Sequence, residues 1–249
     1  MFQKLLKIAG ILLLVAFIVV TLAFTSGESK DIVCRDIEVT FNNSDVIHIN
    51  KNEIMRKVKA ADAKILGKTL DKINSDVIEK EVEKLLAVRK AEVYKIIEKD
   101  TASFRGVLVV KVKHREPVVR IISDNGSYFL DKDGNRIPVS SSYTANVLVV
   151  TGSLSEKYAV EEMLPFVEYI RENDFWNAQI EQIHVEKDGD VLLSPLVGEQ
   201  IIELGSLDDY KGKLRRMKAF YEQVLVKNNW NKYKTISLKY SNQVIAKKS

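Results

Sequence analysis

The chain opens with an apolar segment and continues with short stretches in which hydrophobic and polar positions alternate. Residues 8–24 carry no charged side chain, and this run is slightly shorter than the ~20 residues that cross a bilayer as a helix. Lys4 and Lys7 precede it, whereas the charges that follow it nearly cancel. The positive-inside rule then places the N-terminus in the cytoplasm. We predict a cytoplasmic tail over residues 1–7, a single transmembrane anchor over residues 8–24, and the rest of the chain outside the cytoplasm.

A cleaved signal peptide is the competing interpretation of this segment. Its apolar region usually spans ~7 to 15 residues and ends at a small-x-small cleavage site. Here the apolar run is longer, and Phe24 interrupts the small residues that surround it. We therefore expect the anchor to be retained. The single cysteine, Cys34, cannot form a disulfide within the chain, so the fold must depend on its hydrophobic cores.

The pattern of apolar and polar residues after the anchor predicts an α+β domain. Apolar positions alternate over residues 37–41, as in a half-buried strand. Asn50 and Asn74 each precede a stretch with helical spacing, and residues 91–97 and 107–114 have strand-like patterns. The order strand, helix, helix, strand, strand places two helices on one face of a three-stranded sheet.

The second of these helices, after Asn74, carries charges opposite its apolar positions. Val77, Ile78, Val82, Leu85 and Leu86 recur at three and four residues, and the charged residues between them are Glu79, Lys80, Glu81, Glu83 and Lys84. This spacing is typical of an amphipathic helix. We expect the charges to form its solvated surface.

Pro117 marks the expected boundary between two domains, over residues 25–116 and 117–249, because proline cannot donate to a sheet ladder. Beyond it, Asp133 and Gly134 lie between two apolar stretches, which is a hairpin signal. A strand is expected over residues 147–150, and a second turn is expected at Asp188 and Gly189, between apolar stretches over residues 180–185 and 191–193. The second domain is thus predicted to be a mixed β domain.

Two helices are expected in this β domain. One contains Val160, Leu164 and Val167, and Pro165 should kink it or separate two of its turns. The other begins near Ser206 and Asp209. Its basic residues are Lys211, Lys213, Arg215, Arg216 and Lys218. We interpret them as its solvated face, with a membrane surface or a partner as the alternative.

The chain closes with a predicted strand over residues 234–246. Ile236, Leu238 and Tyr240 alternate with polar residues, so that one face of the strand is apolar. Tyr240 is either a core residue or an exposed anchor for a partner.

The composition and the motifs of the chain do not favour a catalytic function. The 38 Lys and Arg nearly balance 34 Asp and Glu, which does not favour nucleic-acid binding. The chain has no glycine-rich phosphate loop, no Cys-x-x-Cys and no ligand spacing among its three histidines. Asp131, Asp133 and Asn135 resemble the start of a calcium loop but fit a turn better. We predict no enzyme activity, no metal and no cofactor. A membrane-anchored envelope enzyme or a peptidoglycan-binding protein remains the alternative, with a POTRA-bearing transport component as a third.

Several short motifs, in order, resemble a known family. After the anchor and the strand-helix-helix-strand-strand unit come Arg115, Glu116 and Pro117, then Phe129 to Gly134, and finally Ile236 to Tyr240. This arrangement is similar to that of the bacterial division proteins FtsQ and DivIB, in which a POTRA domain precedes a β domain.

The resemblance implies a non-catalytic scaffold of the divisome, the assembly that builds the septum in cell division. It would be a single-pass protein of the cytoplasmic (inner) membrane with its bulk in the periplasm. The POTRA domain would bind other division proteins, and the β domain would bind the FtsB/FtsL subcomplex by strand addition along the last strand. The residues expected to contact this partner are Thr235, Ser237, Leu238, Lys239, Tyr240, Asn242 and Val244.

Overall fold

The computed structural model describes residues 10–21, 32–42, 50–99, 104–140, 145–227 and 230–248. Residues 10–21 are helical. Among the described residues, no helix combines the length and the apolar character needed to cross a membrane. The predicted tail and both ends of the predicted anchor lie outside the described residues. The described chain divides into two compact units, the first ending at His114 and the second beginning at Arg115.

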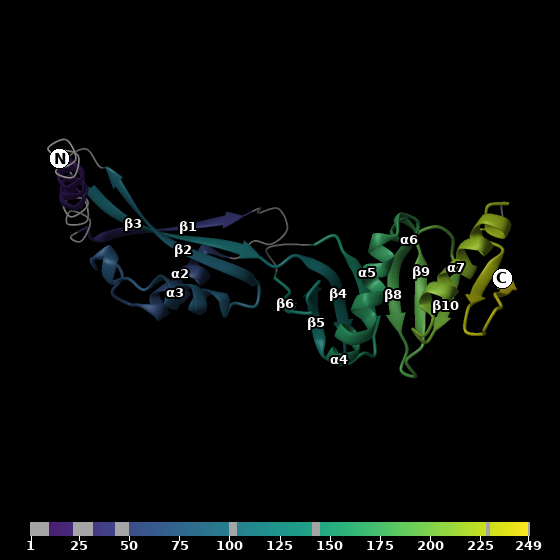
Figure 1. Cartoon of the computed structure of the whole chain (residues 1–249). Coiled ribbons are helices and arrows are strands. Elements are labelled where there is room, and N and C mark those ends of the chain that lie inside the picture. Colours follow the sequence, from purple (N-terminus) through teal and green to yellow (C-terminus); the bar gives the residue numbers. More distant parts are fainter. Residues whose placement is uncertain are drawn as a thin grey trace. The chain divides into compact units, whose positions relative to one another are not determined.

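The first unit is a three-stranded sheet with two helices. Its elements are β1 (Cys34–Asn42), α2 (Lys51–Ala61), the short 3₁₀ turn η2 (Leu70–Lys72), α3 (Ser75–Glu83), β2 (Val88–Lys99) and β3 (Phe104–His114). The strand order is β1-β3-β2, with β1 parallel and β2 antiparallel to the central β3. Both helices lie on one face of this sheet (Figure 1). The predicted order of strands and helices is confirmed.

The two helices of this unit begin where asparagine side chains cap them. The Asn50 side chain accepts a hydrogen bond from the Asn52 N–H, and the Asn74 side chain accepts one from the Val77 N–H. Such caps satisfy backbone donors that have no partner within the helix. Helix α3 ends at Glu83, so Leu85 and Leu86, which we expected inside it, lie in the turn that follows.

Two of the charges expected on the solvated surface of α3 have another role. Glu79 and Glu83 accept hydrogen bonds from backbone N–H groups of β2. The helix is thus held against the edge of the sheet by its own carboxylates as well as by the buried side chains of Ile78 and Val82.

The second unit contains one nine-stranded sheet. Its strands are β4 (Pro117–Ser123), β5 (Gly126–Asp131), β6 (Arg136–Pro138), β7 (Leu148–Gly152), β8 (Ile180–Val185), β9 (Val191–Pro195), β10 (Ile201–Gly205), β11 (Tyr233–Ser237) and β12 (Ile245–Lys248). Their order in the sheet is β12-β11-β10-β9-β8-β7-β4-β5-β6. The helical segments are α4 (Glu156–Tyr158), the π-helix η3 (Ala159–Met163), α5 (Leu164–Glu172), α6 (Asp174–Gln179), α7 (Tyr210–Phe220) and the π-helix η4 (Tyr221–Leu225).

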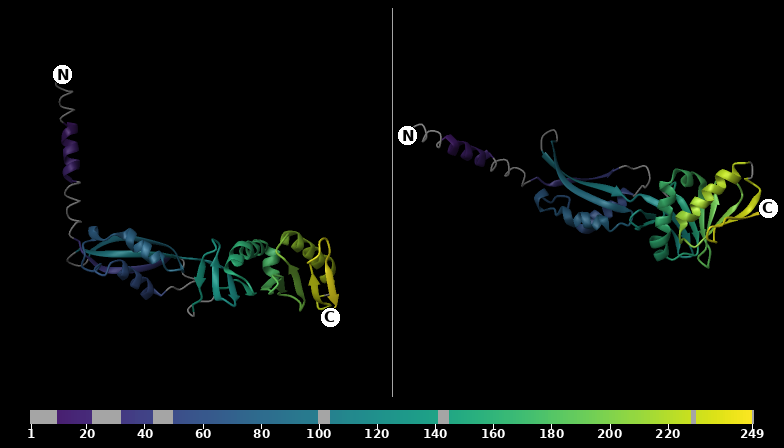
Figure 2. Two further views of the ribbon diagram at one scale, coloured as in Figure 1. Left: turned by 90° about the horizontal axis from the view of Figure 1, so that it is seen from below. Right: turned by 45° about the vertical axis from the view of Figure 1, so that its right-hand side comes forward.

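The helices of the second unit cover one face of its sheet (Figure 2). Their apolar side chains, such as Phe166 and Leu214, form one core with inward-facing strand residues such as Ile183 and Leu193. Alternation of side chains along each strand turns polar positions, for example Gln182 and His184 of β8, to the opposite face. The mixed α+β class predicted from the sequence is confirmed.

Pro165 separates two helical turns, as predicted. It occupies the start of α5, directly after the π-helix η3. The Leu164 N–H donates to the Ala159 carbonyl, five residues earlier. The π-turn therefore changes the hydrogen-bond register of the helix directly before Pro165, which has no backbone N–H to donate.

Three elements of this unit were not predicted, and one was placed wrongly. Strands β4 and β10 and helix α6 had no counterpart in the sequence analysis. The closing strand expected over residues 234–246 is two strands, β11 and β12, which form an antiparallel pair. A single strand over this range is therefore wrong, and the structure puts a turn where its centre was expected.

Candidate partner-binding edge

The strand expected to bind a partner is not at the edge of the sheet. Strand β11 pairs in parallel with β10 on one side and antiparallel with β12 on the other. Thr235 lies opposite Ile201 and Lys247, and Ser237 has cross-strand neighbours on both sides as well. Their backbone groups are therefore engaged in ladders within the chain. The expectation that residues 235–240 form an open edge is wrong, because the last residues of the chain cover it.

Leu238 and Lys239, directly after β11, bind to other parts of the second unit. Leu238 is fully buried, and its N–H donates to the Glu203 carbonyl at 2.8 Å. The Lys239 ammonium hydrogen-bonds the Asp190 carboxylate, which raises the pKa of Lys239 above its ordinary value. We expected both residues to touch a partner, but the structure directs them to the chain itself.

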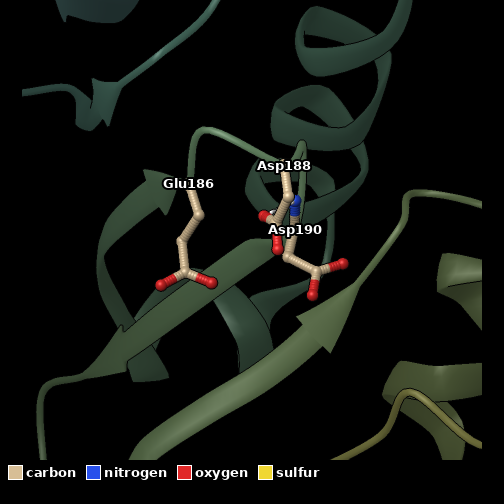
Figure 3. Close-up of side chains that lie close together, drawn as sticks. All are labelled: Glu186, Asp188 and Asp190. Carbon is tan, nitrogen blue, oxygen red and sulfur yellow. Dashed lines mark hydrogen bonds between the residues drawn. The ribbon is translucent and has the colours of Figure 1, made fainter.

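Asp190 belongs to an acidic cluster in the hairpin between β8 and β9 (Figure 3). Carboxylate oxygens of Glu186, Asp188 and Asp190 lie within 4.8 Å of one another. Asp188 Oδ1 accepts a hydrogen bond from the Asp190 N–H at 3.2 Å, and the Glu186 N–H donates to the Asp190 carbonyl at 2.8 Å. The ammonium of Lys239 forms an ion pair with Asp190 of this cluster. The cluster thus shapes the hairpin and ties it to the segment after β11.

The turn after Lys239 contains the remaining expected contact residues. Tyr240 is 59% exposed, so the core alternative for this ring is wrong. Asn242 adopts a left-handed φ of 60°, a conformation that asparagine tolerates better than most residues. Val244 is partly buried against the core. Of the seven expected residues, Tyr240 is the one whose large apolar surface faces solvent.

Strand β12 is the edge strand at this end of the sheet. Among the residues that the structure describes, none pairs with its outer side. Ile245 is 46% exposed, and Lys247 and Lys248 are exposed. The sequence analysis missed this edge because four residues with two lysines have almost no strand pattern of their own. The exposed Tyr240 and Ile245 lie on either side of the turn that leads into it.

The basic residues of α7 are not all on a solvated face. Lys213 is buried, its Nζ donates to the Ser206 carbonyl at 2.7 Å, and burial lowers its pKa. Lys211, Arg215 and Lys218 line a groove of about 350 Å³ next to Tyr169. The predicted solvated face is therefore correct for part of the stretch and wrong for Lys213.

At the other end of the sheet, Asp131 organises the start of the second unit. Its side chain is almost fully buried and accepts hydrogen bonds from Arg115 at 2.8 Å and from the backbone N–H groups of Asp133 and Asn135 at 3.0 and 2.7 Å. Burial alone would raise the pKa of Asp131, but the hydrogen bonds from Arg115 and Asn135 hold it below its ordinary value. The turn interpretation of Asp131, Asp133 and Asn135 is thus confirmed.

The two units define the class of this protein, a POTRA-like unit followed by a sheet-rich domain with helices on one face. The POTRA-like domain family matches residues 32–100, and the family described as FtsQ/DivIB, C-terminal related, matches residues 116–247. The chain belongs to the FtsQ/DivIB family of bacterial cell-division proteins. A search of curated proteins found none that matches it.

Proposed function

We propose that this protein is a non-catalytic scaffold of the divisome that binds an FtsB/FtsL-type subcomplex along the outer edge of β12. The observation that carries this proposal is the end of the nine-stranded sheet, where β12 pairs with β11 on one side and none of the described residues pairs with its outer side. An edge strand presents unpaired N–H and C=O groups, and an extended partner segment can add to it as a further strand.

The surroundings of this edge support a protein partner. Tyr240 and Ile245 are large apolar side chains that are 59% and 46% exposed. Exposed aromatic side chains next to a binding edge are typical anchors of protein interfaces. Lys247 and Lys248 add positive charge, which would favour an acidic segment of the partner.

Proline substitutions in β12 test this proposal. Along an edge strand, backbone groups alternate between the inner neighbour and the open side. One of Ala246→Pro and Lys247→Pro therefore removes an outward donor, and the other removes a donor to β11. We expect the outward variant to keep its melting temperature and to lose partner affinity by up to about a hundredfold, equivalent to ~1–3 kcal/mol.

Tyr240→Ala gives a second measure of the same interface. Loss of an anchor ring should weaken partner binding by ~2 kcal/mol with little change in melting temperature, because this side chain is exposed. Tyr94→Ala is the matched control, since Tyr94 is 45% exposed in the first unit. If both proline variants and Tyr240→Ala fold and bind an FtsB/FtsL complex normally, β12 is not the interface.

We further propose that residues 8–24 anchor the chain in the cytoplasmic membrane, with the tail of residues 1–7 inside and both units in the periplasm. The uncharged sequence of this segment and membership in a family of envelope division proteins support the proposal. Intact mass of protein extracted from membranes should correspond to the full chain. A mature chain that begins near Thr25 would instead identify the segment as a cleaved signal peptide.

A further inference from the structure

The three-stranded sheet of the first unit has two edges, and the chain closes one of them. On the β2 side, the Ala91 N–H donates to Glu83 Oε1 at 3.1 Å and the Val93 N–H donates to Glu79 Oε1 at 2.7 Å. Both carboxylates come from α3. A partner strand would have to displace two charge-assisted hydrogen bonds to pair with these N–H groups. The β2 edge is therefore protected against strand addition.

The β1 edge is closed only at its beginning. There, the Cys34 N–H donates to the Lys68 carbonyl and the Gly67 N–H donates to the Cys34 carbonyl, both at 2.8 Å. The register with β3 then shifts between Cys34 and Asp36. From Ile37 to Asn42, none of the described parts of the chain pairs with the outer side of β1.

The direction of the backbone groups along this open stretch follows from one hydrogen bond. The Ile37 N–H donates to Asp36 Oδ1 at 2.8 Å, so it points away from β3. Because backbone groups of successive residues in a strand face opposite neighbours, those of Val39 and Phe41 also point outward. Three residues thus present N–H and C=O groups on the open side, and one side-chain carboxylate occupies the first N–H.

We propose that two copies of this chain pair through their β1 edges, antiparallel and around a two-fold axis at Val39. In this register Ile37 lies opposite Phe41 of the other copy, and Glu38 lies opposite Thr40. The outward backbone groups of all three residues then face their counterparts. Such a contact is isologous and closes on itself, as in most homodimers.

The charges on β1 favour this register over its neighbours. Moving the axis one residue toward the N-terminus places Glu38 opposite Glu38 of the other copy, and one residue further places Asp36 opposite Glu38. Like charges directly opposite one another are destabilising. The axis at Val39 uses the whole open stretch and keeps the acidic side chains apart.

The side chains on the helix-covered face also fit a second copy. Val39 is buried, and Ile37 and Phe41 are half-buried. Phe41 stacks on His114 with ring centroids 5.1 Å apart. Pairing at Val39 would continue this apolar row from one copy into the next, in the manner of cross-strand pairs within a sheet.

Cysteine cross-linking of the purified full-length chain tests the proposal. Glu38 and Thr40 of the other copy would form a pair without backbone hydrogen bonds between them, with Cα atoms ~4.5 Å apart, which lies in the range that disulfides span. Cys34 is first replaced by alanine. In this background, Glu38→Cys/Thr40→Cys should form a disulfide-linked dimer under mild oxidation, at least about tenfold more than either single cysteine variant.

The matched control is Glu92→Cys/Tyr94→Cys on the closed β2 edge, where two cysteines have the same spacing on a strand. Melting temperatures and reversal by a reducing agent show that each variant is folded and that the cross-link is a disulfide. A dimer yield on β1 no higher than on β2 would overturn the proposal. So would a single-cysteine variant that cross-links as well as the pair, because the register would then be wrong.

Discussion

At the scale of single residues, Asp131 is the side chain whose loss should matter most outside the hydrophobic cores. It is 3% exposed and binds Arg115 together with two backbone N–H groups of its own turn. Asp131→Asn keeps the shape but removes the charge that compensates Arg115. We expect the free energy of unfolding to fall by about 2–4 kcal/mol at neutral pH, measured by urea denaturation.

The same carboxylate predicts a pH dependence. Because the pKa of Asp131 is lowered by folding, its contribution to stability is complete above the unfolded value of ~3.9 and is lost as pH falls through the folded value. The difference between the wild type and Asp131→Asn should therefore shrink below about pH 4. Asp124→Asn, an exposed carboxylate in the turn between β4 and β5, is the control. An equal effect of both substitutions would contradict the role assigned to Asp131.

Gly134, in the same turn, combines a conformational and a steric requirement. Its φ is +76°, and a Cβ there would lie 2.8 Å from Cγ1 of Val160 in η3. Gly189 has a similar φ of +91° but open space around it. Gly189→Ala should lower the free energy of unfolding by ~1–2 kcal/mol from backbone strain alone. Gly134→Ala should lower it by this amount and by a further ~1–3 kcal/mol, because of the clash with Val160.

A double variant separates the cost of backbone strain at Gly134 from the cost of the clash with Val160. In a Val160→Ala background the clashing methyl groups are absent, so Gly134→Ala should cost no more than Gly189→Ala does. Thermal or urea unfolding of the four single and double variants gives the coupling. A Gly134→Ala cost that is unchanged in the Val160→Ala background would show that the turn does not press on η3.

At the scale of elements, α3 is both a core helix and a cover for the β2 edge. Glu79→Ala/Glu83→Ala would leave the Ala91 and Val93 N–H groups without their carboxylate acceptors. We expect a loss of about 1–3 kcal/mol in stability and a new tendency to self-associate through β2, measured by denaturation and sedimentation. Glu79→Gln/Glu83→Gln keeps an acceptor oxygen at each position. If this control behaves like the alanine variant, the hydrogen bonds are not what protects the edge.

Local sequence patterns were sufficient to predict an element that buries one regular face. They were insufficient where pairing between segments distant in sequence decides which residues form a strand. The asparagine caps of α2 and α3, the strand alternation in the first unit and the hairpin at Gly134 were all predictable from neighbouring residues. Alternation of Ile236, Leu238 and Tyr240 predicted one long strand. Leu238 is buried, but its N–H bonds Glu203 and the chain then turns, so that Tyr240 leaves the sheet.

The candidate partner-binding edge could not be predicted from the sequence for the same reason. Which strand forms the edge depends on where the last residues of the chain return, and nothing in the sequence around Thr235 encodes that. Lys239 was expected to contact a partner, yet its charge is matched by Asp190 in a hairpin that is distant in sequence. Likewise, Glu79 and Glu83 have the spacing of a solvated helix face, and only the three-dimensional position of β2 gives them acceptor roles.

At the scale of the whole molecule, the division into two units predicts that each carries its own core and its own interaction edge. Most of the buried hydrophobic residues of the second unit form one cluster that runs from Val118 to Leu238. The sheet of this unit includes both β4, next to the junction at Arg115, and β12. A protein of residues 115–249 should therefore fold cooperatively and bind the FtsB/FtsL-type partner with the affinity of the full chain.

Two measurements on this fragment decide between the roles of the units. Cooperative urea unfolding together with unchanged partner affinity would place the partner site in the second unit, and Ala246→Pro or Lys247→Pro should weaken binding in the fragment as in the full chain. The fragment lacks β1, so it should give no cross-link of the kind expected at Glu38 and Thr40 and should sediment as a monomer. A folded fragment that fails to bind the partner would instead assign the site to the first unit.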